Sequence, residues 1–255
     1  QRILAVGPMR LTRVHVPTEL AVGATLALPE TAATHLLRVL RLQPNDRCVL
    51  FNGDGCDYAA RIVTAGKRDA TVEILSAHAL TNESPLQITL LQSLARGEKM
   101  DWILQKATEL GVQAFVPVNS ERSEVRLGDD RVDKRLAHWR GVVIAACEQS
   151  GRAWVPTVVA PQSMSDALDA LTTTVRCLLD PEATQAIAEF ALPQSRCVLA
   201  VGPEGGWSPR DRMMLHAAGF IGLRLGPRIL RTETAGIAAI AVLQSRHGDL
   251  GIPPD

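Results

Sequence analysis

The sequence lacks the features that mark a membrane protein, a disulfide-bonded secreted protein or a strongly basic nucleic-acid-binding protein. No apolar run approaches the roughly 20 residues that a membrane-spanning helix requires. Lysine plus arginine and aspartate plus glutamate both number 27, so the net charge is zero and any RNA-binding face must be a local patch. The five cysteines are irregularly spaced and form no C-x-x-C pair, which favours free thiols in a reducing cytosol. We therefore expect a globular, cytoplasmic protein with no membrane partner.

Common signatures of catalysis and cofactor binding are also missing. There is no Gly-Lys-Ser/Thr of a Walker loop, and no G-x-G-x-x-G follows a first strand as in a dinucleotide-binding unit. The six histidines form no H-x-x-x-H pair and have no cysteine at ligand spacing, so no metal site is predicted. No Ser-His-Asp or Cys-His order stands out. The site must therefore be sought in less common motifs.

The pattern of the chain changes at residues 81–85, and its 255 residues are enough for one large domain or two smaller ones. This stretch, TNESP, is polar, ends in proline and has no periodicity, which is typical of a linker. Residues 9–80 carry short β-rich runs, and residues 85–250 alternate strands with helices. The eight residues before Met9 are set aside as an upstream extension or an expression remnant.

The first region is predicted to be a small β-barrel. Turn signals separate its short apolar runs, and residues 52–55, NGDG, are a strong hairpin turn. One helix, at 30–39, interrupts the strands and has apolar residues at helical spacing. Strands are expected at 11–16, 25–28, 47–51, 58–63 and 70–75.

The second region predicts an α/β fold, in which a mostly parallel sheet is covered by helices on both faces. Its last helix begins with alanine and glycine residues, which indicates either tight packing on the sheet or a close contact with another subunit or segment. Helices are expected at 98–110, at 131–148, from Ser208-Pro209 onward and at about 232–246. Strands are expected at 87–94, 114–118, 175–179, 198–201 and 221–225.

Two of these strands end in glycine and proline, and the loops that follow them are the candidate binding site. Residues 202–206, GPEGG, follow one strand, and Gly226-Pro227 follows the other. Such loops at the carboxyl ends of strands are where open α/β sheets bind small molecules. Pro203 removes an N–H donor and Glu204 adds negative charge, so the first loop suits a cationic ligand or a ribose hydroxyl better than a phosphate.

These two segments, VGPEGGWSPRD and LRLGPRILRTETAGIAAIAVLQ, resemble the ribosomal RNA methyltransferases that modify ring nitrogen 3 of a uridine, a family of the SPOUT class. Three further stretches are similar to that family: LLQSLARGEKMDWILQKATELGV (90–112), PVNSERSEVR (117–126) and AACEQSGRAWVP (145–156). The resemblance covers nearly the whole chain from about residue 10. The most specific of its motifs is LGPRILRTETA.

The resemblance implies a fold, a cofactor and partners. It implies a C-terminal SPOUT-type α/β domain with a trefoil knot at 85–250, an N-terminal PUA-like β-barrel that binds RNA at 9–80, and a homodimer. The implied cofactor is S-adenosylmethionine, and the implied substrate is 16S ribosomal RNA, within the small ribosomal subunit. In the barrel, Arg10 and Arg13 are candidates for contact with RNA phosphates. The implied cofactor-binding residues are Leu179, Val201, Gly202, Pro203, Glu204, Gly205, Gly206, Leu225, Gly226, Ile229, Leu230, Arg231, Thr232, Thr234 and Ala235.

Methylation of a uracil ring nitrogen requires particular catalytic groups in the protein. The nitrogen must lose its proton before it attacks, so a base or an anion-stabilising cation is needed. Within the family motifs the candidate cations are Arg122, Arg152 and Arg231. Glu148 is a further catalytic candidate, and pairing with Arg122 or Arg152 would instead make it a structural support. The base itself is not identified.

The four tryptophans are predicted to have two different roles. Trp154 and Trp207 flank motif loops and are candidates for stacking on adenine or on a flipped base, whereas Trp102 and Trp139 are expected in the core.

The alternative functions that remain open are a nonenzymatic RNA-binding protein, a SPOUT enzyme that acts on another nucleotide, and a nucleotide-dependent transferase that uses GPEGG for phosphate. The exact target nucleotide stays open as well.

Overall fold

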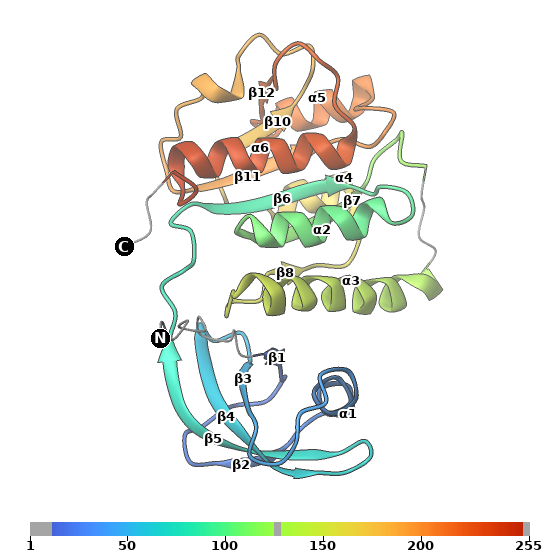
Figure 1. Cartoon of the computed structure of the whole chain (residues 1–255). Coiled ribbons are helices and arrows are strands. Elements are labelled where there is room, and N and C mark those ends of the chain that lie inside the picture. The colour runs from blue at the N-terminus through green and yellow to red at the C-terminus, as the bar shows by residue number, and fades with distance from the viewer. Residues whose placement is uncertain (1–11, 125–128, 252–255) are drawn as a thin grey trace, which may run out of the picture. The chain divides into compact units, whose positions relative to one another are not determined.

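The computed structural model describes residues 12–124 and 129–251, so Arg10 lies outside the described residues (Figure 1). Contacts within the chain divide it into two compact units. The first unit runs to Asn82 and also contains Cys147–Val155, and the second contains Glu83–Ala146 and the chain from Pro156 onward. The short segment Cys147–Val155 therefore belongs with the β-rich first unit, although the sequence pattern placed it in the second region.

The first unit is built on a five-stranded sheet with the order β1-β3-β4-β5-β2. Strand β1 pairs with β3 in parallel, and the other neighbours are antiparallel. The predicted hairpin turn at residues 52–55 joins β3 to β4, and both of its glycines have positive φ, +95° at Gly53 and +90° at Gly55. The predicted helix is continuous but changes from α to π geometry halfway. The elements are β1 (Arg13–His15), β2 (Thr25–Ala27), α1 (Glu30–Thr34), η1 (His35–Val39), β3 (Arg47–Phe51), β4 (Cys56–Ala65) and β5 (Ala70–Ala79).

The core of the first unit follows from alternation along the strands. In β5, Ala70, Val72 and Ile74 are buried while the residues between them are more exposed, because successive side chains of a strand point to opposite faces. Leu36 of the helix is fully buried in the same cluster. All five predicted strands are present, and β4 and β5 are longer than predicted.

The second unit is an α/β fold with a parallel sheet in the order β12-β10-β11-β6-β7-β8, and β9 also pairs with β7. The parallel sheet and its five predicted strands are confirmed. The two-residue strands β8 and β9 and the short helices α4 and η2 were not predicted, because elements of this length carry little periodicity. The strands are β6 (Gln87–Ser93), β7 (Val112–Asn119), β8 (Thr157–Val158), β9 (Gln162–Ser163), β10 (Arg176–Leu179), β11 (Arg196–Val201) and β12 (Ile221–Leu223).

Helices lie on both faces of this sheet (Figure 1). Helices α2 and α6 contact each other on one face, and α4 and α5 contact each other on the other. Helix α5 begins as predicted: the Ser208 hydroxyl accepts a hydrogen bond from the Asp211 N–H at 3.0 Å, Asp211 completes a capping box, and proline follows the cap. The helices are α2 (Lys99–Glu109), α3 (Asp129–Ser150), α4 (Met164–Ala170), η2 (Ile187–Glu189), α5 (Pro209–Ala217) and α6 (Thr232–His247).

The two tryptophans predicted to lie in the core behave differently. Trp139 is buried as expected, but the prediction for Trp102 is wrong, since 59% of it is exposed. The buried face of α2 carries Ile103, Leu104 and Ala107, and position 102 points away from that face at helical spacing. Among the described residues no helix combines the length and apolar character needed to cross a membrane.

Candidate functional site

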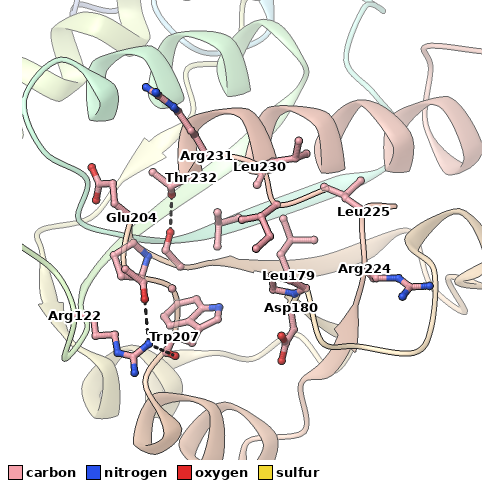
Figure 2. Close-up of a pocket in the computed structure, with 18 of the residues that line it drawn as sticks. Arg122, Leu179, Asp180, Glu204, Trp207, Arg224, Leu225, Leu230, Arg231 and Thr232 are labelled. Atoms are coloured by element: carbon pink, nitrogen blue, oxygen red, sulfur yellow. Dashed lines mark hydrogen bonds between the residues drawn. The ribbon is translucent and has the colours of Figure 1, made fainter. Parts of the chain in front are cut away.

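The strand order places the carboxyl ends of β10, β11 and β12 side by side, and the loops that follow them enclose a cavity of about 410 Å³ (Figure 2). This volume is in the range of small-molecule sites, and the carboxyl edge of a parallel sheet is where such sites form. All the predicted cofactor residues line the cavity except Thr234, which is exposed on the first turn of α6. The cavity therefore collects, in one place, both loops that the sequence singled out.

The first of these loops, residues 202–207, is called the glycine loop here. Gly206 has a φ of +66° and its N–H donates to the Pro203 carbonyl at 2.9 Å, a tight turn that favours glycine. The indole of Trp207 is 3% exposed and packs beneath the loop, where a Cβ on Gly202 would lie 3.2 Å from it. Trp207 is thus a buried part of the cavity wall.

The second loop, residues 224–231, is called the arginine loop here. Its start is fixed, because the main chain of Arg224 accepts a hydrogen bond from the Ile187 N–H at 3.0 Å and donates one to the Gln185 carbonyl at 2.9 Å. Gly226 has a φ of +68°, a conformation that side-chain-bearing residues rarely adopt. The tip of the arginine loop is exposed to solvent, since Ile229 is 84% exposed.

A buried threonine ties the two loops together. The Thr232 hydroxyl donates to the Gly202 carbonyl at 2.5 Å (Figure 2). It also accepts a hydrogen bond from the Gln92 amide at 3.2 Å. Thr232 is the first residue of α6 and is 5% exposed. The position of the arginine loop therefore depends on the glycine loop through a bond that is shielded from water.

The third loop of the site was not predicted. It begins with Asp180-Pro181 after β10, and the Asp180 carboxylate, 7% exposed, accepts a hydrogen bond from Arg212 of α5 at 2.6 Å. Asp180, Pro181 and Arg212 all line the cavity. A signal was present in the sequence, because a third apolar strand also ends abruptly, in aspartate and proline.

Glu204 of the glycine loop is paired with a protein cation. One oxygen of its carboxylate accepts hydrogen bonds from the Lys99 ammonium at 2.8 Å and from the Arg96 N–H at 3.2 Å. Burial alone would raise the pKa of Glu204, but these hydrogen bonds outweigh burial and leave the pKa below its ordinary value. The same bond raises the pKa of Lys99. At neutral pH both groups are therefore charged, and the pair fastens the loop to the start of α2.

Two of the predicted catalytic arginines reach the cavity. Arg122 donates to the Gly205 carbonyl at 3.1 Å and, at 3.5 Å, to that of Trp207 (Figure 2). Arg231 is exposed at the N-cap of α6, and within the described residues no hydrogen bond of its side chain is found. The loop that carries Arg122 is held in place by three serine hydroxyls within 2.6 to 3.0 Å of one another, those of Ser93, Ser120 and Ser123.

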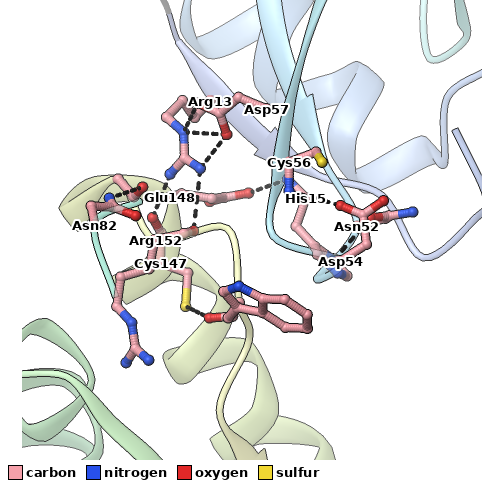
Figure 3. Close-up of polar contacts among 12 residues, drawn as sticks. Arg13, His15, Asn52, Asp54, Cys56, Asp57, Asn82, Cys147, Glu148 and Arg152 are labelled. Atoms are coloured by element: carbon pink, nitrogen blue, oxygen red, sulfur yellow. Dashed lines mark hydrogen bonds and ion pairs between the residues drawn. The ribbon is translucent and has the colours of Figure 1, made fainter. Parts of the chain in front are cut away.

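The other two catalytic candidates, Glu148 and Arg152, belong to the first unit and do not line the cavity (Figure 3). The Glu148 carboxylate accepts a hydrogen bond from the main-chain N–H of His15 at 2.9 Å, and this partner was not predicted. Burial lowers the pKa of His15, and the nearby Glu148 carboxylate partly offsets this shift. Arg152 is 5% exposed, and its carbonyl is an acceptor in the same network.

Arg13, predicted to reach RNA phosphates, is the centre of that network (Figure 3). Its guanidinium is paired with Asp57 at 2.6 Å and donates to the carbonyls of Cys147 at 2.8 Å and Arg152 at 3.2 Å. It also lies 4.6 Å from the ring centroid of Phe51, a cation–π contact. The side chain is only 7% exposed, so its donors are largely used within the first unit.

One aromatic side chain of the first unit is left at the surface. Trp154 is 51% exposed and lies over the hairpin turn, where a Cβ on Gly55 would be 2.6 Å from the indole nitrogen. Glycine at position 55 is therefore required both by its positive φ and by the indole that covers it. Stacking of Trp154 on a base stays a prediction.

The chemistry of the cavity can be tested against the predicted cofactor. Apolar side chains from the ends of β10, β11 and β12 offer a slot for a flat ring, and the main chain of the glycine loop offers polar groups. Two lining residues carry a buried polar atom without a partner among the described residues, Trp207 Nε1 and one carboxylate oxygen of Glu204. A ligand that has an apolar ring, hydrogen-bonding hydroxyls and a positive centre fits this set.

Comparison with known proteins agrees with this architecture. An RNA methyltransferase PUA domain matches residues 28–75, and an RNA methyltransferase domain matches residues 82–244. The fold and the cavity are therefore those of an RNA methyltransferase with an attached PUA-like domain. Ribosomal RNA small subunit methyltransferase E of Buchnera aphidicola is 33% identical over 244 residues, which are 94% of this chain and 98% of that protein. The chain belongs to the ribosomal RNA small subunit methyltransferase E family.

Solved structures support the same assignment. Methyltransferase E of Neisseria gonorrhoeae, crystallised with S-adenosylmethionine, is 43% identical, with a TM-score of 0.88 over 94% of this chain and 99% of that one. A Legionella pneumophila protein solved with the same cofactor is 35% identical, with a TM-score of 0.91 over 94% of this chain and 100% of that one.

Proposed function

We propose that this protein transfers a methyl group from S-adenosylmethionine to ring nitrogen 3 of a uridine in 16S ribosomal RNA. The observation that carries the proposal is the cavity between the glycine and arginine loops, in a chain whose relatives are named as methyltransferases of the small-subunit RNA. The uridine and its ring nitrogen come from the motif resemblance.

The lining residues support a division of the cofactor site into parts. Leu179, Val201 and Leu225 supply apolar walls for the adenine ring, and the main chain of the glycine loop supplies polar contacts. The second oxygen of Glu204 has no hydrogen-bond partner among the described residues, and its proposed partner is a hydroxyl or a positive charge of the cofactor. When bound, the cofactor supplies an electrophilic methyl group on a sulfonium, which already has a good leaving group.

The protein's own task is to prepare the uracil. The ring nitrogen must give up its proton, and the negative charge then spreads to the neighbouring carbonyl oxygens. Arg231 and Arg122, both at the cavity, are placed in the role of stabilising this charge and orienting the base. Glu148 and Arg152, predicted as catalytic, do not line the cavity, and a supporting role near the end of α3 is proposed for them instead.

Finer expectations belong to the same proposal. The family resemblance supports a trefoil knot in the second unit, closure of the first unit's sheet into a PUA-like barrel, a homodimer, a cytoplasmic location and action within the small ribosomal subunit. Light scattering of the purified protein tests the dimer, since a monomeric mass at assay concentration would contradict it.

Calorimetry with S-adenosylhomocysteine and with ATP tests the cofactor assignment, because both carry adenosine and only one carries phosphates. We expect S-adenosylhomocysteine to bind at a 1:1 ratio per chain and ATP to bind far more weakly. Preference for ATP would favour a nucleotide-dependent transferase instead. If neither bound while ribosomal RNA did, the protein would be an RNA-binding protein without this activity.

A further inference from the structure

Positive charge is concentrated around the cavity, although the chain as a whole is neutral. The lining residues include six basic side chains, against two acidic ones, Asp180 and Glu204. Each acidic side chain is already paired, with Arg212 at 2.6 Å and with Lys99 at 2.8 Å. A cleft with an excess of one charge focuses the field and attracts ligands of the opposite sign.

Three of the remaining basic residues lie on the arginine loop, namely Arg224, Arg228 and Arg231. All three are exposed, and within the described residues their side chains make no hydrogen bond or ion pair. Figure 2 draws Arg224 and Arg231 apart, at the two ends of the arginine loop, so the loop carries positive charge at both ends. Because the main chain of Arg224 is fixed by two hydrogen bonds, its guanidinium extends from a defined point.

An arginine at a protein surface is usually a solubilising group with little structural role. These residues differ because they surround a cavity and because their fork of N–H donors is left without a protein acceptor. Guanidinium groups bind phosphate oxygens in bidentate fashion, and this geometry is harder to satisfy with lysine. The cofactor of the proposed function carries a carboxylate but no phosphate. The phosphate groups of the substrate RNA are therefore the anions that suit these arginines.

We infer that Arg224 and Arg228 form a phosphate-binding site for the RNA strand at the mouth of the cavity, where they hold the phosphates beside the target nucleotide. The inference rests on the proposed function, since it places the RNA at this cavity. Arg231 keeps its separate role at the base. Phosphate contacts position a nucleic acid without reading its sequence, so the site fixes the register of the target rather than its identity.

The test compares two double variants with the same change in charge. In Arg224→Gln/Arg228→Gln both proposed contacts are lost. In the control, Arg196→Gln/Arg246→Gln, two exposed arginines are replaced that do not line the cavity; one of them begins β11, at the end opposite to the glycine loop. Affinity for a 16S ribosomal RNA transcript is measured from about 50 to about 200 mM salt, beside calorimetry with S-adenosylhomocysteine and light scattering.

We expect the Arg224→Gln/Arg228→Gln variant to bind RNA at least about tenfold more weakly than the control. The slope of log affinity against log salt is negative, and its magnitude should fall by about 1.4, which is about 0.7 for each phosphate contact with a single strand. Affinity for S-adenosylhomocysteine and the oligomeric mass should equal those of the control.

Other results would overturn the inference in distinguishable ways. RNA affinity and salt slope equal to the control would remove the phosphate site and leave the proposed methyl transfer standing. A selective loss of S-adenosylhomocysteine affinity would reassign the arginines to the cofactor carboxylate, and a change in mass would reassign them to a subunit contact. Failure of the proposed function itself would appear in the unaltered protein, as absent S-adenosylhomocysteine binding.

Discussion

Replacement of Thr232 by valine tests how the two loops of the cavity are held together. The hydroxyl donates to the Gly202 carbonyl at 2.5 Å and accepts from the Gln92 amide at 3.2 Å, and Thr232 is 5% exposed. Valine keeps the shape of the side chain but leaves the Gly202 carbonyl without its hydrogen-bond donor. The Gln92 amide retains its second hydrogen bond, to the Ser93 carbonyl at 2.9 Å. One buried acceptor left unpaired costs about 2 kcal/mol.

This cost is divided between folding and binding. If the loops stay in place, the free energy of unfolding falls by about 2 kcal/mol. If they separate, the binding-competent form becomes a minor population and the Kd for S-adenosylhomocysteine rises, by at most about 30-fold for the same energy. Urea unfolding and calorimetry on the same variant measure the two parts.

Two matched variants make the Thr232→Val result specific. Thr234→Val makes the same chemical change at an exposed position of the same helical turn and should leave stability and affinity nearly unchanged. Thr232→Ser restores the hydroxyl and should recover most of the loss. If Thr232→Val matched the unaltered protein in both measurements, the hydroxyl would not be what couples the loops.

Three further predictions concern charged groups. Arg231→Ala should lower the single-turnover methylation rate about 10²–10³-fold and Arg231→Lys less, with S-adenosylhomocysteine affinity within a few-fold; a near-normal rate for Arg231→Ala would end the catalytic assignment. Asp57→Asn, which breaks a pair with a 7% exposed arginine, should lower the free energy of unfolding by about 3 kcal/mol, whereas Glu73→Gln, in an exposed pair, should change it by less than about 1 kcal/mol; equal urea midpoints would refute this. Because the pKa of Glu204 is lowered in the folded protein, its contribution is complete above the unfolded-state pKa and is lost as the pH falls through the folded one. Glu204→Gln should therefore flatten the acid side of the stability profile, and an unchanged acid slope would argue against this linkage.

The parts of the site that could be predicted from the sequence have local causes. The glycine loop and the start of α5 were found because glycine, proline and an N-cap serine determine the main-chain conformation of their own neighbours. The strands before both loops are short apolar runs, and a parallel sheet necessarily brings their carboxyl ends to one edge.

The parts that could not be predicted depend on contacts between distant residues. Arg13 looked available for RNA, but its acceptor on Cys147 lies 134 positions away and is brought to it only by the fold. The pair of Asp180 with Arg212 joins β10 to α5, and neither residue shows this in its local sequence. For the same reason the assignment of Cys147–Val155 to the first unit was missed.

The most direct test of the central claim is the identity of the nucleoside that the protein methylates. 16S ribosomal RNA, free or in small subunits prepared without this modification, is incubated with the protein and labelled S-adenosylmethionine, and its nucleosides are separated by mass. The account predicts a single labelled product, 3-methyluridine, that depends on an intact cavity and forms about 10²–10³-fold more slowly with Arg231→Ala. Label on any other nucleoside, or no transfer to either RNA substrate by a protein that binds the cofactor, would contradict it.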